Sequence, residues 1–258
     1  MSVLEFTTNP FRGVIIDNTA LPDDTEVFRS HLRESLDAWK AEGYRVAWLE
    51  AHLARAALIP VAVDAGFTFH HSGDGYVMMT CRMEKGAFVP EYASHYIGAG
   101  GVVINERREL LVVHEAGRRP PGKRSYKLPG GALLAGEDLE EGVVREVLEE
   151  TGVATRFEAV VCLRNLHDYR YGKSDIYFVC RLSPLTHEIT MQADEIEDCL
   201  WMPLDEYMSA DNVSDFNKVI VRAALETPGL VRTRVDGYRN RRLETYIAGW
   251  DGVVVEGP

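Results

Sequence analysis

The sequence of 258 residues has no apolar run approaching the ~18 residues that span a bilayer as a helix. Its N-terminus also lacks a basic segment followed by an apolar core, so no signal peptide is expected. Basic residues are in the minority, because 28 Lys and Arg stand against 40 Asp and Glu, a net charge of -12. Nucleic acids and anionic membranes are bound chiefly through basic surface, so this balance argues against both as partners.

Cysteine is also sparse, with four residues and no CxxC pair. Each lies in an apolar stretch with the pattern of a strand, which favours buried free thiols and a reducing cytoplasm. The positions are Cys81, Cys162, Cys180 and Cys199. The remaining composition is that of an ordinary globular protein, with 46% hydrophobic and 26% charged residues. A chain of this length suits two modest domains.

The first part of the chain, residues 1–90, predicts a small α/β domain. Apolar patterns and turn signals give the order β-α-β-α-β-β, with elements expected at Gly13–Asp17, Asp24–Ala41, Val46–Leu49, Leu53–Ala65, Phe67–His71 and Tyr76–Met83. The second helix is expected to be interrupted by Pro60. This order is similar to part of an acetyltransferase-like fold, but no Gly-rich pyrophosphate loop is present. We therefore expect a docking, regulatory or dimerising role for this domain.

Residues 86–94 contain Pro90 and show no periodicity, so they are interpreted as a linker. A second domain is expected over residues 91–230, followed by a C-terminal extension over residues 231–258. Its predicted elements are strands at Tyr96–Ile104, Glu109–His114, Phe157–Leu166 and Ser174–Leu182 and a helix at Phe216–Leu225. The extension could pack on either domain or on a second subunit.

The densest acidic cluster of the sequence lies in the second domain, between Glu137 and Glu150. Apolar residues recur there at spacings of three and four, which predicts an amphipathic helix ended by Gly152. Glu146, Glu149 and Glu150 occupy positions i, i+3 and i+4, so three carboxylates share one strip of that helix. Such a cluster is either a solvated acidic face or a site for a hard cation with oxygen ligands, of which Mg²⁺ fits best.

The spacing around this helix is specific. Gly131 is followed after five residues by Glu137 and after seven more by Arg145-Glu146, and then by Glu149-Glu150, Gly152 and Val153. This pattern resembles, without departure, the signature of the Nudix hydrolases, which cleave nucleoside diphosphates linked to another moiety. The resemblance implies an α/β/α sandwich with a mixed sheet, here preceded by the small acetyltransferase-like α/β domain, as in some plant and animal members.

The resemblance also implies residue roles. The expected ligands of a Mg²⁺ ion, or alternatively of Mn²⁺, are Glu146, Glu149, Glu150 and the backbone carbonyl of Gly130. Arg145 is expected to orient carboxylates at the catalytic centre, with Gly131, Glu137 and Gly152 in structural roles. The base that deprotonates the attacking water is either a glutamate of the signature or an acid from a later loop, Glu195 or Glu197.

Substrate-binding candidates come from three places. A loop with five bases and no acid precedes the signature, an aromatic residue stands where many family members carry tryptophan, and two polar residues follow on later strands. These candidates are Arg118, Arg119, Lys123, Arg124, Tyr126, Arg164 and His167. Each of them could instead be part of a solvated loop or a structural hydrogen-bond donor.

The hypothesis is therefore a Mg²⁺-dependent pyrophosphohydrolase, acting on ADP-ribose or NADH and yielding AMP and a phosphorylated product. The small α/β domain at residues 1–90 and the sequence beyond the signature resemble those of the plant and animal group linked to these substrates. The alternative is a Nudix-fold module that senses or regulates through such a nucleotide without turnover. A cytoplasmic homodimer that binds a small-molecule nucleotide is expected.

Overall fold

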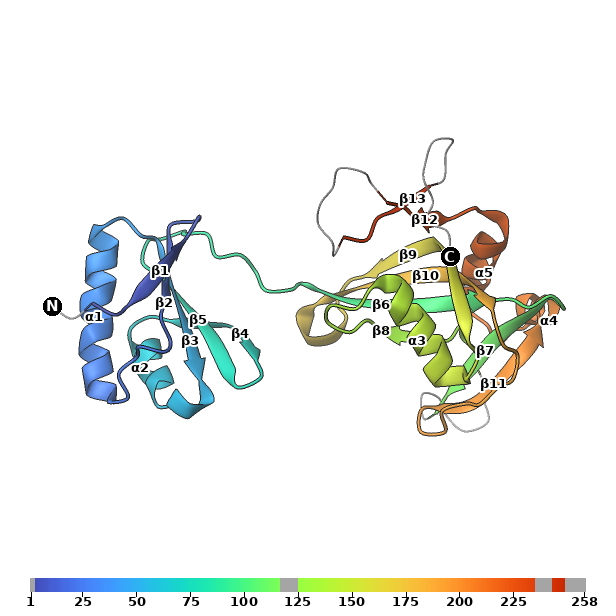
Figure 1. Cartoon of the computed structure of the whole chain (residues 1–258), viewed down its shortest axis with the longest axis horizontal. Coiled ribbons are helices and arrows are strands. Elements are labelled where there is room, and N and C mark those ends of the chain that lie inside the picture. Colours follow the sequence, from blue (N-terminus) through green and yellow to red (C-terminus); the bar gives the residue numbers. More distant parts are fainter. Residues whose placement is uncertain (1–2, 117–124, 235–242, 249–258) are drawn as a thin grey trace. The chain divides into compact units, whose positions relative to one another are not determined.

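The computed structural model describes residues 3–116, 125–234 and 243–248, and the chain forms two compact units, Met1–Ser94 and His95–Pro258 (Figure 1). Each unit has its own sheet and its own buried apolar side chains. None of the helices in the described ranges has the length and hydropathy needed to cross a membrane.

The first unit is a five-stranded sheet with two helices (Figure 1). Its strand order is β1-β2-β3-β5-β4, in which β2 and β3 are parallel and the other neighbours antiparallel. The elements are β1 (Phe6–Asn9), β2 (Gly13–Ile16), α1 (Thr25–Ala41), β3 (Val46–His52), a 3-10 turn (Leu53–Arg55), α2 (Leu58–Asp64), β4 (Thr68–Gly73) and β5 (Tyr76–Arg82).

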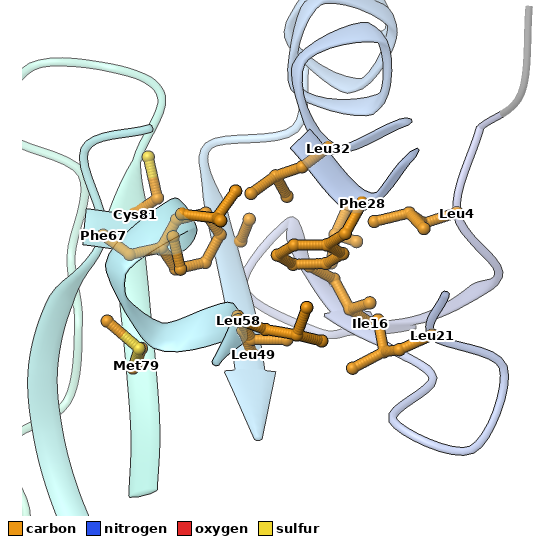
Figure 2. Close-up of a cluster of buried hydrophobic side chains, with 14 of the residues drawn as sticks. Leu4, Ile16, Leu21, Phe28, Leu32, Leu49, Leu58, Phe67, Met79 and Cys81 are labelled. Atoms are coloured by element: carbon orange, nitrogen blue, oxygen red, sulfur yellow. The ribbon is translucent and has the colours of Figure 1, made fainter. Parts of the chain in front are cut away.

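Helix α1 begins where its sequence predicts, because the Asp24 side chain accepts hydrogen bonds from the backbone N–H groups of Glu26 and Val27. Phe28 and Leu32 lie on its buried face and are fully enclosed. They pack with residues of β3, β5 and α2 in one apolar cluster, which is shown in Figure 2. Burying a side chain of this size contributes about 1.5–3 kcal/mol, so this cluster supplies the unit with a core of its own.

The second predicted helix of this unit is split. Residues 53–55 form a 3-10 turn, and α2 starts only at Leu58, so Pro60 lies at the third helical position. The interruption predicted at Pro60 is therefore wrong, because the break precedes Leu58 and α2 continues through the proline. Backbone N–H groups of a helical first turn have no partner within the helix, so a proline there breaks no hydrogen bond.

The second unit contains a six-stranded sheet of order β13-β12-β9-β10-β6-β8 and a two-stranded sheet of β11 and β7 (Figure 1). The larger sheet is mixed, since β10 is parallel to β6 and antiparallel to β9. The elements are β6 (His95–Val103), β7 (Glu109–Glu115), β8 (Gly130–Ala132), α3 (Leu139–Thr151), β9 (Thr155–Leu166), a 3-10 turn (Arg170–Gly172), β10 (Ser174–Pro184), β11 (Ile196–Pro203), α4 (Leu204–Ser209), α5 (Asp215–Glu226), β12 (Leu230–Arg232) and β13 (Tyr246–Ala248).

Apolar side chains of β10 alternate between two cores. Val179 packs with residues of α4 and α5, whereas Cys180 and Leu182 pack with Val143 and Val147 of α3. Because neighbouring strand residues point to opposite faces, α3 and α5 cover opposite sides of the mixed sheet. The predicted α/β/α arrangement, preceded by a second α/β unit, is thereby confirmed. The acetyltransferase likeness of the first unit stays a prediction.

A turn joins β6 and β7, in which the Arg108 N–H donates to the Asn105 carbonyl. It does not create a long hairpin, however. One isolated bridge joins Ile104 to Leu110, after which β6 runs between β10 and β8 and β7 pairs with β11. The pairing of β7 therefore depends on a strand about 90 residues later, which local sequence does not reveal.

The described part of the C-terminal extension packs on the second unit, at the start of α3. Arg232 forms ion pairs with Asp138 at 3.0 Å and with Glu140 at 3.2 Å. The Glu244 carboxylate accepts the backbone N–H of Leu139, and β13 pairs with β12. An acidic side chain thus caps the helix N-terminus, where the Asp138 side chain makes no capping hydrogen bond.

Candidate active site

Helix α3 carries the acidic cluster and is anchored at both ends. Its apolar face buries Val143 and Val147 completely. Gly152 ends it in the left-handed region at φ 73°, and a Cβ there would meet the backbone of Thr190 at 2.8 Å. The predicted helix and its glycine stop are therefore present, with the first helical residue at Leu139 instead of Glu137.

Arg145 is the centre of an ion-pair network on this helix. Its Nε and Nη2 donate to the two carboxylate oxygens of Glu137 at 2.7 and 3.0 Å. Its Nη1 donates to Glu146 and to Glu149, each at 2.9 Å. Such a planar guanidinium fixes several carboxylates at once, and its hydrogen bond holds the pKa of Glu137 below the usual range. This arrangement fits the structural partnership expected of Glu137 and Arg145.

Glu150 is the most deeply buried of the three signature glutamates, with 5% of its surface exposed. Its Oε2 accepts the backbone N–H of Gly130 at 2.8 Å, and its Oε1 lies 3.7 Å from Lys127 Nζ. Burial is the largest influence on this carboxyl and raises its pKa to about 7, although Lys127 and the Gly130 N–H oppose the shift. Glu150 is thus a carboxylate that a nearby cation would stabilise.

Glu146 lies beside the glycine pair that precedes the helix. A Cβ added at Gly131 would meet Glu146 Oε2 at 2.4 Å, and one added at Gly130, where φ is 146°, would meet the Ala99 carbonyl oxygen at 2.3 Å. The two glycines let the loop approach the carboxylate closely. Burial also raises the pKa of Glu146, while the contact with Arg145 lowers it.

These groups border one cavity of about 900 Å³ in the second unit. Its lining includes both glycines and the side chains of Glu146, Glu150, Glu115, Lys127, Arg164, Asp175, Tyr177 and Glu195. The volume lies within the range typical of small-molecule sites. Acidic and basic side chains therefore face the same cavity.

Arg164 is held at the wall of this cavity by two neighbours. Its Nη2 lies 3.2 Å from a carboxylate oxygen of Asp175, which is buried. Its guanidinium also lies over the Tyr177 ring, 5.1 Å from the centroid. The arginine is thus positioned to present positive charge to a ligand.

The predicted site residues separate into three groups. Gly130, Gly131, Glu146, Glu150, Arg164 and Glu195 line the cavity. Glu149, Glu197, Tyr126 and His167 do not, and Arg118, Arg119, Lys123 and Arg124 lie outside the described residues. Those four basic residues therefore remain predictions.

The residues away from the cavity have other surroundings. The Glu149 side chain is 53% exposed and pairs with Arg145. Tyr126 is buried and donates a hydrogen bond to Asp198 at 2.7 Å, and His167 is exposed beside Ser174, 3.1 Å from its hydroxyl. Lys127 lines the cavity, whereas the preceding Tyr126 packs in an apolar cluster with Val102 and Leu110. The structure thus gives Tyr126 a place in the packing and none at the cavity.

Several lining residues were not among the predicted site residues, and the polar ones among them include Glu115, Lys127 and Tyr177. Lys127 Nζ forms an ion pair with Glu115 at the end of β7. The available signal was weak, since Glu115 is simply the acid that follows the apolar run Leu110–Val113 by two positions. The ion pair of Glu115 with Lys127 depends on the backbone bridge between Val113 and Lys127. The local pattern of apolar residues does not predict this bridge.

The cavity residues fit a hard divalent ion. Among the residues that the structure describes, no three His, Cys, Asp or Glu side chains converge as a preformed metal cluster. Two carboxylates, Glu146 and Glu150, face the cavity beside the Gly130 backbone, and burial disfavours the charged form of both. Mg²⁺ is commonly bound by one or two carboxylates and completes its shell with water and substrate phosphates. The donor set is therefore suitable for it.

Comparisons with known proteins agree with this geometry. The family model of the Nudix hydrolase domain matches residues 4–83, and that of the NUDIX domain matches residues 94–223. The chain is similar to Nudix hydrolase 8 of Arabidopsis thaliana, 40% identical over 80% of this chain and 57% of that protein. It is 38% identical to Nudix hydrolase 2 of the same plant, over 83% of this chain and 77% of that protein. It is also 32% identical to human nucleoside diphosphate-linked moiety X motif 6, over 78% of this chain and 64% of that protein.

Proposed function

The chain belongs to the Nudix hydrolase family, whose members are pyrophosphohydrolases, and from this premise we propose that it cleaves ADP-ribose or NADH in a metal-dependent reaction. The products are AMP and a phosphorylated second moiety. The alignments span 57% and 77% of the first two relatives named above, so the activity of the whole protein is part of the proposal.

One observation supports the proposal above all others. Two signature carboxylates, the buried Glu150 and the partly buried Glu146, share a cavity of about 900 Å³ with the cations Lys127 and Arg164. A diphosphate bridge carries negative charge on its oxygens, so a site for its hydrolysis needs cations for the substrate and oxygen ligands for a metal. Both kinds of group face the same space here.

In this proposal Glu146, Glu150 and the Gly130 carbonyl hold Mg²⁺, or alternatively Mn²⁺, with Glu149 as a further ligand by family resemblance. When bound, such an ion neutralises phosphate oxygens and makes phosphorus easier to attack. Arg145 keeps Glu146 and Glu149 in place through its 2.9 Å contacts. The buried Gly130 N–H bond does the same for Glu150.

The remaining cavity residues act on the substrate and on the attacking water. Arg164, fixed by Asp175, binds phosphate oxygens and orients the diphosphate for in-line attack. Glu195 lines the cavity and is the candidate base that accepts the proton of the attacking water. Glu197 is a poorer candidate, because it lies 3.5 Å from His114 and does not line the cavity.

The setting is proposed to be the cytoplasm, with the protein acting as a homodimer. All four cysteines are free thiols, two of them buried, as a reducing compartment permits. Size-exclusion chromatography with light scattering measures the oligomeric state directly, and a single species at the 28.9 kDa of one chain would exclude the dimer.

A panel of nucleotides tests the function. The intact protein is incubated with ADP-ribose, NADH and other nucleoside diphosphate derivatives, each with Mg²⁺ and with EDTA, and AMP release is measured. The proposal predicts metal-dependent release from ADP-ribose or NADH. Binding of these nucleotides without any release, under every metal condition, would favour a sensing module over an enzyme.

A further inference from the structure

Lys127 lies between two carboxylates on the lining of the cavity. Its Nζ forms an ion pair with Glu115 and lies 3.7 Å from Glu150 Oε1. All three side chains are largely shielded, with 27% of Lys127, 20% of Glu115 and 7% of Glu150 exposed. Solvent screening is weak in such surroundings, so these charges interact strongly.

The position of Lys127 is fixed by its backbone. Its N–H donates to the Val113 carbonyl and its carbonyl accepts the Val113 N–H, both at 2.9 Å. Val113 and Glu115 are two residues apart on β7 and thus point to the same side of the strand. The ammonium group is therefore held close to Glu115 while its flexible stem still reaches Glu150.

Two basic side chains of the protein lie beside the signature glutamates. Arg145 pairs with Glu146 and Glu149, whereas Lys127 is the cation beside Glu150. The Oε2 atom of Glu150 already accepts the Gly130 N–H, so its Oε1 atom, the one near Lys127, is the less engaged ligand for a metal ion. Mg²⁺ requires oxygen ligands at about 2.0–2.1 Å, which brings a dication into the region that the ammonium group occupies.

From these contacts we infer that Lys127 is a positioning residue that competes with the metal for Glu150, and that Glu115 holds the ammonium group aside when the ion binds. The inference rests on the proposed metal site. In the metal-free protein Lys127 offsets the charge of a buried carboxylate. On metal binding the ammonium group keeps its ion pair with Glu115 and moves away from Glu150, so the protein keeps its cavity charges paired in both states. Lys127 thereby sets the metal affinity without being a ligand.

The inference makes predictions of opposite sign for the two partners. Lys127→Met keeps the length of the side chain but removes the competing charge, so Mn²⁺ should bind about tenfold more tightly. Glu115→Gln removes the group that draws the ammonium away, so Mn²⁺ should bind roughly three- to tenfold more weakly. Lys127→Arg retains the charge and should stay closer to the wild type than Lys127→Met does.

The measurement is Mn²⁺ binding to the full chain without substrate, by isothermal titration calorimetry and by loss of the free-ion paramagnetic resonance signal. Lys85→Met is the matched control, because it removes one positive charge at an exposed position of the other unit. Thermal unfolding of each variant in EDTA shows whether it is folded. Glu150→Gln identifies the site, since it should abolish the specific binding.

The outcomes separate the two claims. Tighter binding in Lys127→Met, weaker binding in Glu115→Gln and no change in Lys85→Met support the inference. Equal or weaker binding in Lys127→Met, with Glu150→Gln abolishing it, overturns the competition while leaving the proposed metal site intact. Lack of specific Mn²⁺ binding by the wild type, or equal binding by Glu150→Gln, overturns the metal site and this inference together.

Discussion

In the first unit the buried polar residues among those described are the neutral Ser35 and Thr80, whereas in the second unit they include the carboxylates of Glu150 and Asp175. Both units are mixed α/β sheets with helices and apolar cores. Burying a carboxylate costs several kcal/mol unless it is paired and hydrogen-bonded, and packing alone gives no reason to accept that cost. In the second unit both carboxylates have cationic partners at the cavity, Lys127 for Glu150 and Arg164 for Asp175, whereas the core of the first unit needs no such partners.

Ion pairs show the same contrast. Arg45 pairs with Glu84 in the first unit with side-chain exposures of 35% and 57%, so solvent weakens the attraction. Arg145 in the second unit is 25% exposed and binds three carboxylates, of which Glu137 is 12% exposed. The first pair is weakened by solvent, whereas the second network fixes the positions of Glu137, Glu146 and Glu149.

The strongest test of the contrast is Glu150→Gln. This change removes a buried charge from the proposed metal shell, so AMP release should fall on the order of 10³-fold, about 4 kcal/mol in activation free energy. Glu141→Gln is the matched control, because this glutamate of the same helix is exposed and does not line the cavity, and it should leave the rate unchanged. Equal rates in the wild type and Glu150→Gln would mean that the cavity is not the catalytic centre.

A core substitution probes the other unit. Leu32 is fully buried on α1, so Leu32→Ala should lower the free energy of unfolding of the first unit by about 2–5 kcal/mol. Urea denaturation followed by circular dichroism measures the change. Mn²⁺ affinity should be unaffected in conditions where both units are folded, since all residues lining the cavity belong to the second unit. A weakened affinity there would show that the first unit contributes to the site.

The free energy of unfolding should depend on pH through the titration of Glu150. Its folded pKa of about 7 exceeds the ordinary value of 4.5, so between these values the folded state binds more protons than the unfolded state. The free energy of unfolding in EDTA should therefore fall as pH rises from about 4.5 to 7, by up to about 3 kcal/mol. Denaturation curves at several pH values check this, and Glu150→Gln should remove the slope. The same slope in that variant would assign it to another group.

Glu137 should change the free energy of unfolding in the opposite direction, so that stability falls with decreasing pH, and it should do so at lower pH than Glu150. Arg145 depresses its pKa below 4.5, so the stabilisation is present above that value and is lost as pH falls below it.

The smallest effect is expected for the exposed ion pair of the first unit. Arg45→Ala should change the free energy of unfolding by about 0.2–1 kcal/mol, and 0.5 M NaCl should reduce the difference further. Chemical denaturation at two salt concentrations measures both quantities. A loss comparable to that of Leu32→Ala would contradict the distinction between surface pairs and buried networks.

Much of the site could be predicted from the sequence because it is local. The period of residues 137–150, the glycines on either side and the i, i+3, i+4 glutamates all lie in one segment, and α3 forms there. Glu146 and Glu150, which this segment and its resemblance to a known family single out, both line the cavity, and their roles stay a prediction. The order of elements in the first unit was also readable from apolar periodicity, apart from the short β1 and the split before α2.

The features of the site that could not be predicted from the sequence depend on contacts between distant segments. Glu115 and Lys127 meet only because residue 127 bridges to β7, and β7 in turn pairs with β11. Glu149 was expected to face the metal with its neighbours, but adjacent helical residues point about 100° apart, and packing turns Glu150 inward and Glu149 outward. The packing of Glu244 on the start of α3 likewise joins residues 105 positions apart.

The most direct measurement is the initial rate of AMP release from ADP-ribose and from NADH by the intact protein, titrated with Mg²⁺ from zero to saturation. The account predicts that at least one of the two rates rises with Mg²⁺, saturates, and returns to background when EDTA is added in excess. A rate that is the same with Mg²⁺ and with EDTA would contradict the claim that the buried carboxylates of α3 act through a divalent ion.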